Sequence, residues 1–132
     1  MIVHRHQPRI DRAIAYGHAI ARVAIGAGIA TAPRRWLGRD WFGEHANDPA
    51  TRIAMRGMGA RELALGAMIL RDLLRGGSAR ELFALCAAAE LVDIGGSLAG
   101  PSSFRRSPAI RVSGLALSAV LSGAYLASRG DV

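Results

Sequence analysis

The chain has 132 residues, of which 51% are hydrophobic and 5% aromatic, and it carries 17 basic against 10 acidic residues. This length is typical of one domain, and the composition excludes intrinsic disorder and a disulfide scaffold. Every basic residue is Arg, because the chain contains no Lys. This excludes chemistry that needs a Schiff-base or P-loop lysine. The arginines are scattered and accompany no nucleic-acid-binding signature, so we expect no nucleic-acid partner.

Four segments are long and apolar enough to be membrane-spanning helices. They cover residues 13–33, 52–70, 82–100 and 112–128, and each is close to the roughly 20 residues that cross a bilayer core. Apolar residues recur with a helical period, and no alternating run indicates a strand. No segment reaches 18 uncharged residues in a row, so this prediction rests on four similar lengths. The sequence predicts an all-α fold, in which residues 1–132 form one four-helix up-down transmembrane bundle in the cell membrane.

Loop residues support these boundaries. Asn47-Asp48-Pro49 predicts a helix start with Pro at the first helical position. Ser78 and Glu81 have the spacing of a capping box for the helix predicted over 82–100. The arginines outside the spans divide equally between the two sides of the membrane, so the positive-inside rule leaves the orientation open.

Three aromatic residues lie together between the first two predicted spans, at Trp36, Trp41 and Phe42. Indole rings favour the headgroup level of a bilayer, and the neighbouring arginines can reach lipid phosphates. These residues therefore predict an interfacial anchor. The alternative is a loop that folds its aromatic rings over the end of a soluble bundle.

Six charged residues lie inside the predicted spans, three basic and three acidic: Arg22, Arg56, Arg61, Glu62, Glu90 and Asp93. A charge at bilayer depth costs about 2.5–3.5 kcal/mol or more unless it is paired, so these side chains are expected to face the interior as a buried charged cluster. Glu90 and Asp93 share one helix face because they are three residues apart. We expect Arg22 and Arg61 to be their counter-charges.

Other positions extend these polar faces. On the segment 52–70, one buried stripe is expected to contain Met55, Gly59, Glu62 and Gly66. Arg61 is turned by about 100° from Glu62 on the same helix. His18 shares a face with Arg22, and Tyr125 places a hydroxyl near the end of the segment 112–128. His18 and Tyr125 are secondary site candidates.

Two interpretations of the polar centre stay open. In the first, ion pairs hold Gly- and Ala-rich helices together. In the second, Glu90 and Asp93 share one proton beside an Arg and form a proton-handling or ligand-binding site. No pattern of metal ligands or cofactor motif is present, so we expect neither a metal nor a cofactor.

Residues 56–66 read Arg-Gly-Met-Gly-Ala-Arg-Glu-Leu-Ala-Leu-Gly. This stretch resembles a Gly-Ala-Arg-acidic-x-x-x-Gly motif of small four-helix integral membrane proteins of high-GC bacteria, a domain of unknown function. The similarity extends over residues 20–125 and includes the Trp-rich loop and the acidic span 82–100. The resemblance implies a location and a fold, and it carries no reaction.

Three classes of function are open. The chain can act through interaction, as an accessory subunit or homo-oligomer beside a membrane partner protein. It can be a membrane-embedded acid/base enzyme of the isomerase or cyclase type, or a binder of a lipophilic small molecule, using Glu90 or Asp93 with Arg22 or Arg61. It can also be a soluble all-α bundle that holds an apolar ligand. The lipid bilayer is the partner expected for the first two classes.

Overall fold

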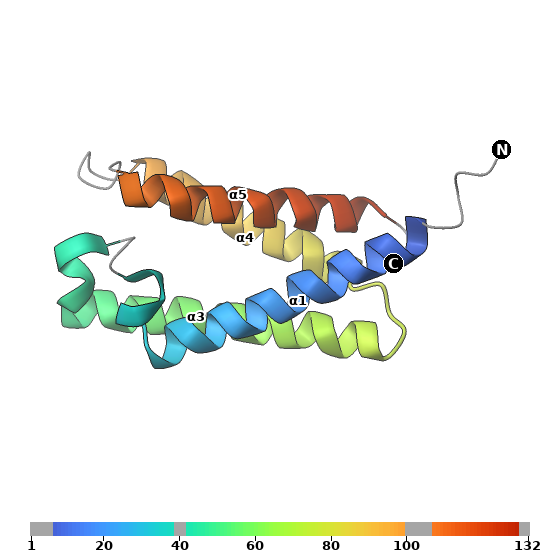
Figure 1. Cartoon of the computed structure of the whole chain (residues 1–132), viewed down its shortest axis with the longest axis horizontal. Helices are drawn as coiled ribbons and strands as arrows, with labels where there is room; N and C mark the ends of the chain where they lie inside the picture. The colour runs from blue at the N-terminus through green and yellow to red at the C-terminus, as the bar shows by residue number, and fades with distance from the viewer. Residues whose placement is uncertain (1–6, 39–41, 100–106, 130–132) are drawn as a thin grey trace.

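The computed structural model describes residues 7–38, 42–99 and 107–129, and these residues form helices and turns without a strand. The long helices are α1 (Gln7–Thr31), α3 (Pro49–Leu74), α4 (Arg80–Ala99) and α5 (Ser107–Ser128) (Figure 1). Between α1 and α3 the chain forms a π-helical turn, η1 (Arg34–Gly38), and a 3-10 segment, η2 (Gly43–Asn47). The all-α prediction is confirmed, and most of the helices extend beyond the predicted ranges.

The helices are arranged as two hairpins, α1 with α3 and α4 with α5 (Figure 1). Glycines allow α1 and α3 to approach closely. A methyl group at Gly66 would lie 2.8 Å from the backbone nitrogen of Val23, and one at Gly26 would collide with the backbone of Leu63. Small residues at helix interfaces permit backbone contact of this kind. The first hairpin is therefore a tightly packed pair.

The second hairpin joins the first through a small apolar core at one end of the molecule. The buried residues of this core come from all four long helices and the α3–α4 loop: Ala15, Ala19, Ile69, Leu73, Ala79, Phe83, Cys86 and Leu126. Gly123 of α5 lies against the backbone of α4, because a methyl group there would be 3.2 Å from the carbonyl oxygen of Phe83. Polar side chains also join the two hairpins.

The loop predictions are partly confirmed. Helix α3 begins at Pro49 as predicted, but the side chain of Asp48 does not cap it; this carboxylate instead lies 3.1 Å from Nδ1 of His45. The predicted capping box is wrong, because α4 begins at Arg80 and the residue before it is Ala79 with φ of 50°. The backbone N–H of Ala79 donates to Oδ2 of Asp72 at 2.7 Å. A side chain from the end of α3 thus binds the start of α4.

The aromatic loop folds back onto α1. The ring of Trp36 lies so close to Gly28 that a methyl group at Gly28 would overlap it. Trp36 is nevertheless 42% exposed, and Phe42 is half-buried. Trp41 lies outside the described residues. The loop therefore has features of both alternatives, a ring packed on a helix end and an exposed indole face.

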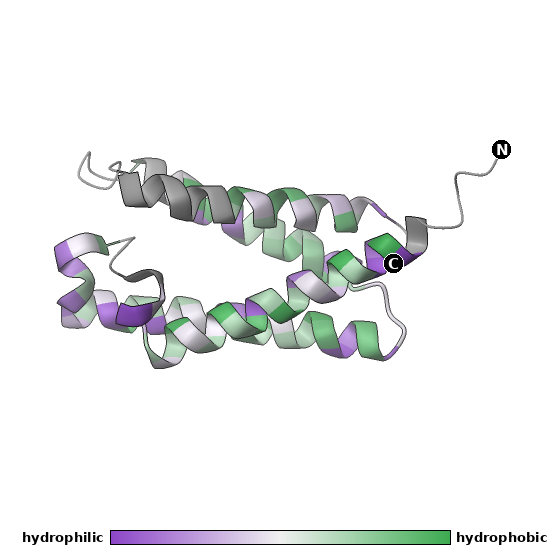
Figure 2. Ribbon diagram, viewed as in Figure 1, coloured by the Kyte–Doolittle hydropathy of each residue, from purple (hydrophilic) through white to green (hydrophobic). Residues whose placement is uncertain are grey.

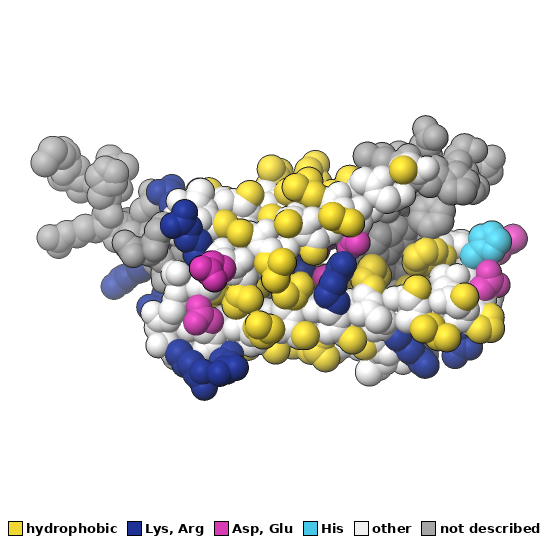
Figure 3. Space-filling view, turned by 180° about the vertical axis from the view of Figure 1, so that it is seen from behind, with side chains coloured by type: hydrophobic (Ala, Val, Ile, Leu, Met, Phe, Trp, Pro, Cys, Tyr) yellow, Lys and Arg dark blue, Asp and Glu magenta, His cyan; other side chains and the backbone are white. Residues whose placement is uncertain are grey.

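Large apolar side chains are exposed along the outer faces of the helices, while charged side chains are buried between them. Val92 is 73% exposed and Leu121 is 63% exposed, whereas Arg22 is 5% exposed. Hydrophobic residues run along each helix in Figure 2. In Figure 3 they cover the central part of one face, with most basic side chains toward the ends.

On length and composition, α1 over Arg9–Thr31 is the one helix in the described part of the chain that could cross a membrane. Residues 116–128 of α5 form a shorter apolar helix. The predicted four-span architecture and multi-pass location are thus not confirmed. Helix α3 explains much of the difference, since its first fourteen residues include Arg52, Arg56, Arg61 and Glu62.

Candidate functional site

A cavity of about 400 Å³ lies between the two hairpins. The apolar part of its lining includes Ile14, Ile25, Ile29 and Met58. The polar part of the lining, the polar wall, comes from all four long helices: His18, Arg22, Arg61, Glu62, Glu90, Asp93, Ser118 and Ser122. Four lining residues are exposed, Ile14, Gly17 and Ala21 of α1 and Ser118 of α5, so the cavity opens to the surface between α1 and α5.

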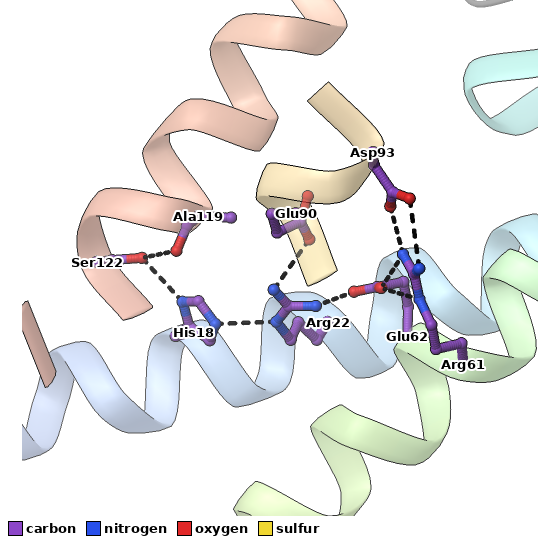
Figure 4. A network of polar contacts seen from close by, with 8 residues as sticks. All are labelled: His18, Arg22, Arg61, Glu62, Glu90, Asp93, Ala119 and Ser122. Atoms are coloured by element: carbon purple, nitrogen blue, oxygen red, sulfur yellow. Dashed lines mark hydrogen bonds and ion pairs between the residues drawn. The ribbon is translucent and has the colours of Figure 1, made fainter. Parts of the chain in front are cut away.

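Arg22 of α1 is the centre of the polar wall (Figure 4). Its Nη1 donates to Oε2 of Glu62, and its Nη2 donates to Oε1 of Glu90 at 2.9 Å. The side chains of Arg22, Glu62 and Glu90 are 6%, 10% and 14% exposed. A single guanidinium therefore joins α1 to α3 and to α4 through two ion pairs of low exposure.

The third hydrogen bond of Arg22 fixes which ring nitrogen of His18 carries the proton. Nε of Arg22 donates to Nε2 of His18 at 2.9 Å, so this ring nitrogen carries no proton. The proton of the neutral ring is then on Nδ1, which donates to Oγ of Ser122 at 2.9 Å. Ser122 in turn donates to the carbonyl oxygen of Ala119 at 3.2 Å. One chain of hydrogen bonds with a single direction thus runs from α1 into α5 (Figure 4).

Arg61 of α3 forms the second branch of the network. Its Nη2 lies 3.0 Å from Oε1 of Glu62 and 2.5 Å from Oδ2 of Asp93, and its Nη1 lies 3.4 Å from Oδ1 of Asp93. The predicted angle between Arg61 and Glu62 does not separate them, because the long Arg side chain turns back toward its neighbour. Glu62 is thereby held between two guanidinium groups.

Arg56 does not belong to this cluster, which corrects the grouping expected from the sequence. Its side chain is exposed on α3. Helical geometry gives the reason, since Arg56 is six residues before Glu62 and so about 120° away around the helix. The cluster in the described part of the chain therefore contains two arginines and three carboxylates. With His18 neutral, its formal charge is −1 when all three acids are ionised.

The three carboxylates differ in how they are held. Both oxygens of Glu62 accept hydrogen bonds from arginines, and both oxygens of Asp93 face Arg61. Glu90 accepts from Arg22 through Oε1, and within the described residues its Oε2 accepts no hydrogen bond. Since Glu90 also lines the cavity, it is the carboxylate best placed to meet a ligand.

Tyr125, the other secondary candidate, lies in a separate cluster near the end of α5. Its hydroxyl donates to Oδ1 of buried Asp11 at 2.8 Å, and Arg129 donates to the same hydroxyl at 3.0 Å. The sequence patterns did not reveal Asp11 or Ser122 as members of these clusters. Asp11 lies before the first predicted span, and no pattern in the sequence distinguishes Ser122 from the other serines of that segment.

The site offers a neutral imidazole, two guanidinium groups and a carboxylate beside an apolar space. Among the described residues no group of three or more His, Cys, Asp or Glu could hold a metal ion. No protein family model, curated protein or solved structure matches this chain. The resemblance to small four-helix membrane proteins therefore stays a prediction.

Proposed function

We propose that this chain is a multi-pass integral membrane protein that binds a lipophilic small molecule in the cavity between its two hairpins. The observation that carries the proposal is the cavity itself, which is lined by apolar side chains together with a charged network. Ligand sites are typically concave and mostly apolar, with a few polar groups that orient the ligand. Arg22, His18 and Arg61 are held in place by two or more hydrogen bonds each, which supports a preformed site.

The distribution of side chains supports the membrane part of the proposal. A soluble helical bundle places charges outside and apolar residues inside. This chain has the reverse arrangement in its middle: Arg22 and Glu62 are buried, while Leu85, Val92 and Leu121 are more than half exposed. Intramembrane charges face the bundle interior and pair with one another. A bilayer around the middle of the molecule would cover the exposed apolar side chains.

The opening of the cavity supports a lipophilic ligand. It lies between α1 and α5 at exposed Gly17, Ala21 and Ser118. In the proposed membrane arrangement, the side chains beside this opening, such as Ile20 and Leu117, face hydrocarbon. A molecule dissolved in the bilayer would therefore enter sideways, with its apolar body leading.

Fractionation tests the membrane part. The expressed protein should stay with membranes through an alkaline carbonate wash and be released by detergent. Release by carbonate, or a soluble protein without detergent, would contradict the multi-pass architecture. The cavity would then belong to a soluble bundle that binds an apolar ligand.

Ligand binding is tested with the neutral fluorophore N-phenyl-1-naphthylamine added to purified protein in detergent. Saturable fluorescence enhancement is expected for the wild-type chain. Ala21→Trp, which places an indole at the mouth of the cavity, should remove this enhancement. Ala24→Trp is the matched control, because Ala24 is exposed on the same helix and does not line the cavity. Equal enhancement by both variants would show that the probe binds elsewhere.

A further inference from the structure

The dimensions of the cavity carry an inference about the class of ligand, which rests on the proposed function. The side chains of α1 that line the cavity extend from Ile14 to Ile29. At a rise of 1.5 Å per residue, this stretch of helix is roughly 22 Å long. The volume of about 400 Å³ is spread along that length, which gives a mean cross-section of roughly 18 Å². The cavity is therefore long and narrow.

A space of this cross-section fits one hydrocarbon chain. Carbon atoms in contact lie about 3.5–4.0 Å apart, so a single chain occupies roughly 16 Å² and two chains side by side need about twice that area. A methylene group fills about the space of one water molecule, roughly 30 Å³, so the cavity holds about 13 such groups. We propose that the ligand is a single-chain amphiphile of about 10–13 carbons, such as a straight-chain alcohol.

The lining changes from polar to apolar along the length of the cavity. His18 of α1 and Ser122 of α5 lie close to the opening, joined by a hydrogen bond of 2.9 Å. Ile29 is three turns further along α1, roughly 16 Å away. Met58 of α3 lies at the level of Ile29, because a methyl group at the adjacent Gly59 would be 2.9 Å from the backbone of Ile29. The polar end of an amphiphile therefore lies at the opening, and its tail extends toward Met58.

Small residues at the opening leave room for a chain to enter. Gly17 and Ala21 are one turn apart on α1, and a methyl group at Gly17 would meet no atom within 4 Å outside its own stretch of helix. The lining residues of α5 include Ala116, Ser118 and Ala119, which are also small. A chain dissolved in the bilayer can thus pass between α1 and α5 with its tail leading.

The same dimensions exclude wider lipids from this cavity. A steroid has roughly twice as many nonhydrogen atoms as the volume can hold, and its fused rings cannot fold into a narrower shape. A phospholipid with two acyl chains is larger still. The cavity therefore selects single-chain molecules from the lipophilic molecules of a membrane.

Displacement of N-phenyl-1-naphthylamine tests this selectivity. The full chain is purified in digitonin, whose steroid body is too large for the cavity, so that no single-chain detergent competes. Dodecanol should displace the saturable fluorescence, and cholesterol at the same mole fraction in the micelles should not. Equal displacement by the two molecules, or displacement by neither, would overturn the single-chain inference.

Photolabelling tests the direction of the bound chain. One dodecanol analogue carries a diazirine beside the hydroxyl group, and a second carries it beside the terminal methyl group. The first should label the protein at Gly17, Ala21 or Ser118, and the second at Ile29 or Met58. Excess dodecanol should suppress both reactions. The same labelling pattern for both analogues would contradict the proposed direction.

Met58→Phe fills the apolar end of the cavity with the volume of roughly three methylene groups. Dodecanol is then displaced toward the opening and its hydroxyl group leaves the polar side chains, so its binding should weaken about fivefold, the equivalent of one hydrogen bond of about 1 kcal/mol. Octanol is shorter and should bind as it does to the wild-type chain, which also shows that the variant is folded. Met68→Phe is the matched control, because Met68 is 49% exposed on the same helix and does not line the cavity. Unchanged dodecanol binding to Met58→Phe, or equal weakening of both alcohols, would refute the inference.

The outcomes separate this inference from the proposed function. If the fluorophore binds and Ala21→Trp prevents its binding, but dodecanol does not displace it, the ligand cavity stands and the single-chain inference fails. If neither the fluorophore nor the labelled alcohols bind in the cavity, both proposals fail.

Discussion

Replacing Arg22 by Met tests the charge balance of the network. Arg22 donates hydrogen bonds to Glu62, Glu90 and His18, and its side chain is 6% exposed. Methionine keeps much of the length of the side chain and removes the charge. Glu62 retains Arg61 as a partner, whereas Glu90 loses its ion pair. Within the described residues, Glu90 is then a carboxylate without an ion pair.

The magnitude follows from the extra proton that the folded variant must hold. A carboxyl group has a pKa of about 4.3 in water, so keeping one protonated at pH 7 costs about 3.7 kcal/mol. This agrees with the roughly 3–5 kcal/mol lost when one partner of a buried ion pair is removed. We expect Arg22→Met to lower the free energy of unfolding by about 4 kcal/mol at pH 7.

The sign of the pH dependence follows from the same proton. The folded variant binds one proton that the unfolded chain releases at pH 7, so lowering the pH favours the folded state of the variant. Between pH 7 and pH 6 the destabilisation relative to wild type should shrink by about 1.4 kcal/mol. Reversible unfolding in mixed micelles, followed by circular dichroism, measures both quantities.

Arg56→Met is the control, because Arg56 is an exposed arginine inside a long helix. It should change neither the free energy of unfolding nor its pH dependence. Equal stability of the two variants would refute the charge balance of the network, and so would a cost of Arg22→Met that is the same at pH 6 and pH 7.

Three further substitutions test the contacts that position the network, each by thermal unfolding in detergent. Gly26→Ala forces a methyl group into the backbone of α3 and should destabilise the protein by about 2 kcal/mol, whereas Gly57→Ala, with open space around it, should stabilise it by about 0.5–1 kcal/mol. Asp72→Ala removes the acceptor at the start of α4 and should cost about 1–2 kcal/mol, with Asp72→Asn largely restoring stability. Tyr125→Phe removes a donor to buried Asp11 and should cost about 1–3 kcal/mol. If Gly26→Ala, Asp72→Ala and Tyr125→Phe all unfolded at the wild-type temperature, these contacts would not position the hairpins.

Periodicity predicted the features that depend on one helix alone. The stripe on α3 is buried as expected: Met55, Gly59, Glu62 and Gly66. Glu90 and Asp93 face the same side and meet Arg22 and Arg61, as the pairing of charges required. These results follow because a spacing of three or four residues fixes a common face, and buried charges need partners.

Features that depend on how helices are placed could not be predicted in this way. The contact between His18 and Ser122 joins residues 104 positions apart, and no local pattern marks it. Arg56 was grouped with the cluster by its depth along the predicted span, although its angle around the helix excludes it.

The cavity wall and the contact between the hairpins consist of the same side chains. Arg22 reaches across to Glu90, Arg61 to Asp93, and His18 to Ser122. The small apolar core and the Asp11 cluster also join the hairpins. A charge that arrives at or leaves Glu90 therefore changes the strength of the bonds that hold the hairpins together. The proposed binding of a ligand in this cavity is therefore expected to alter the packing of α1 against α5, where the cavity opens.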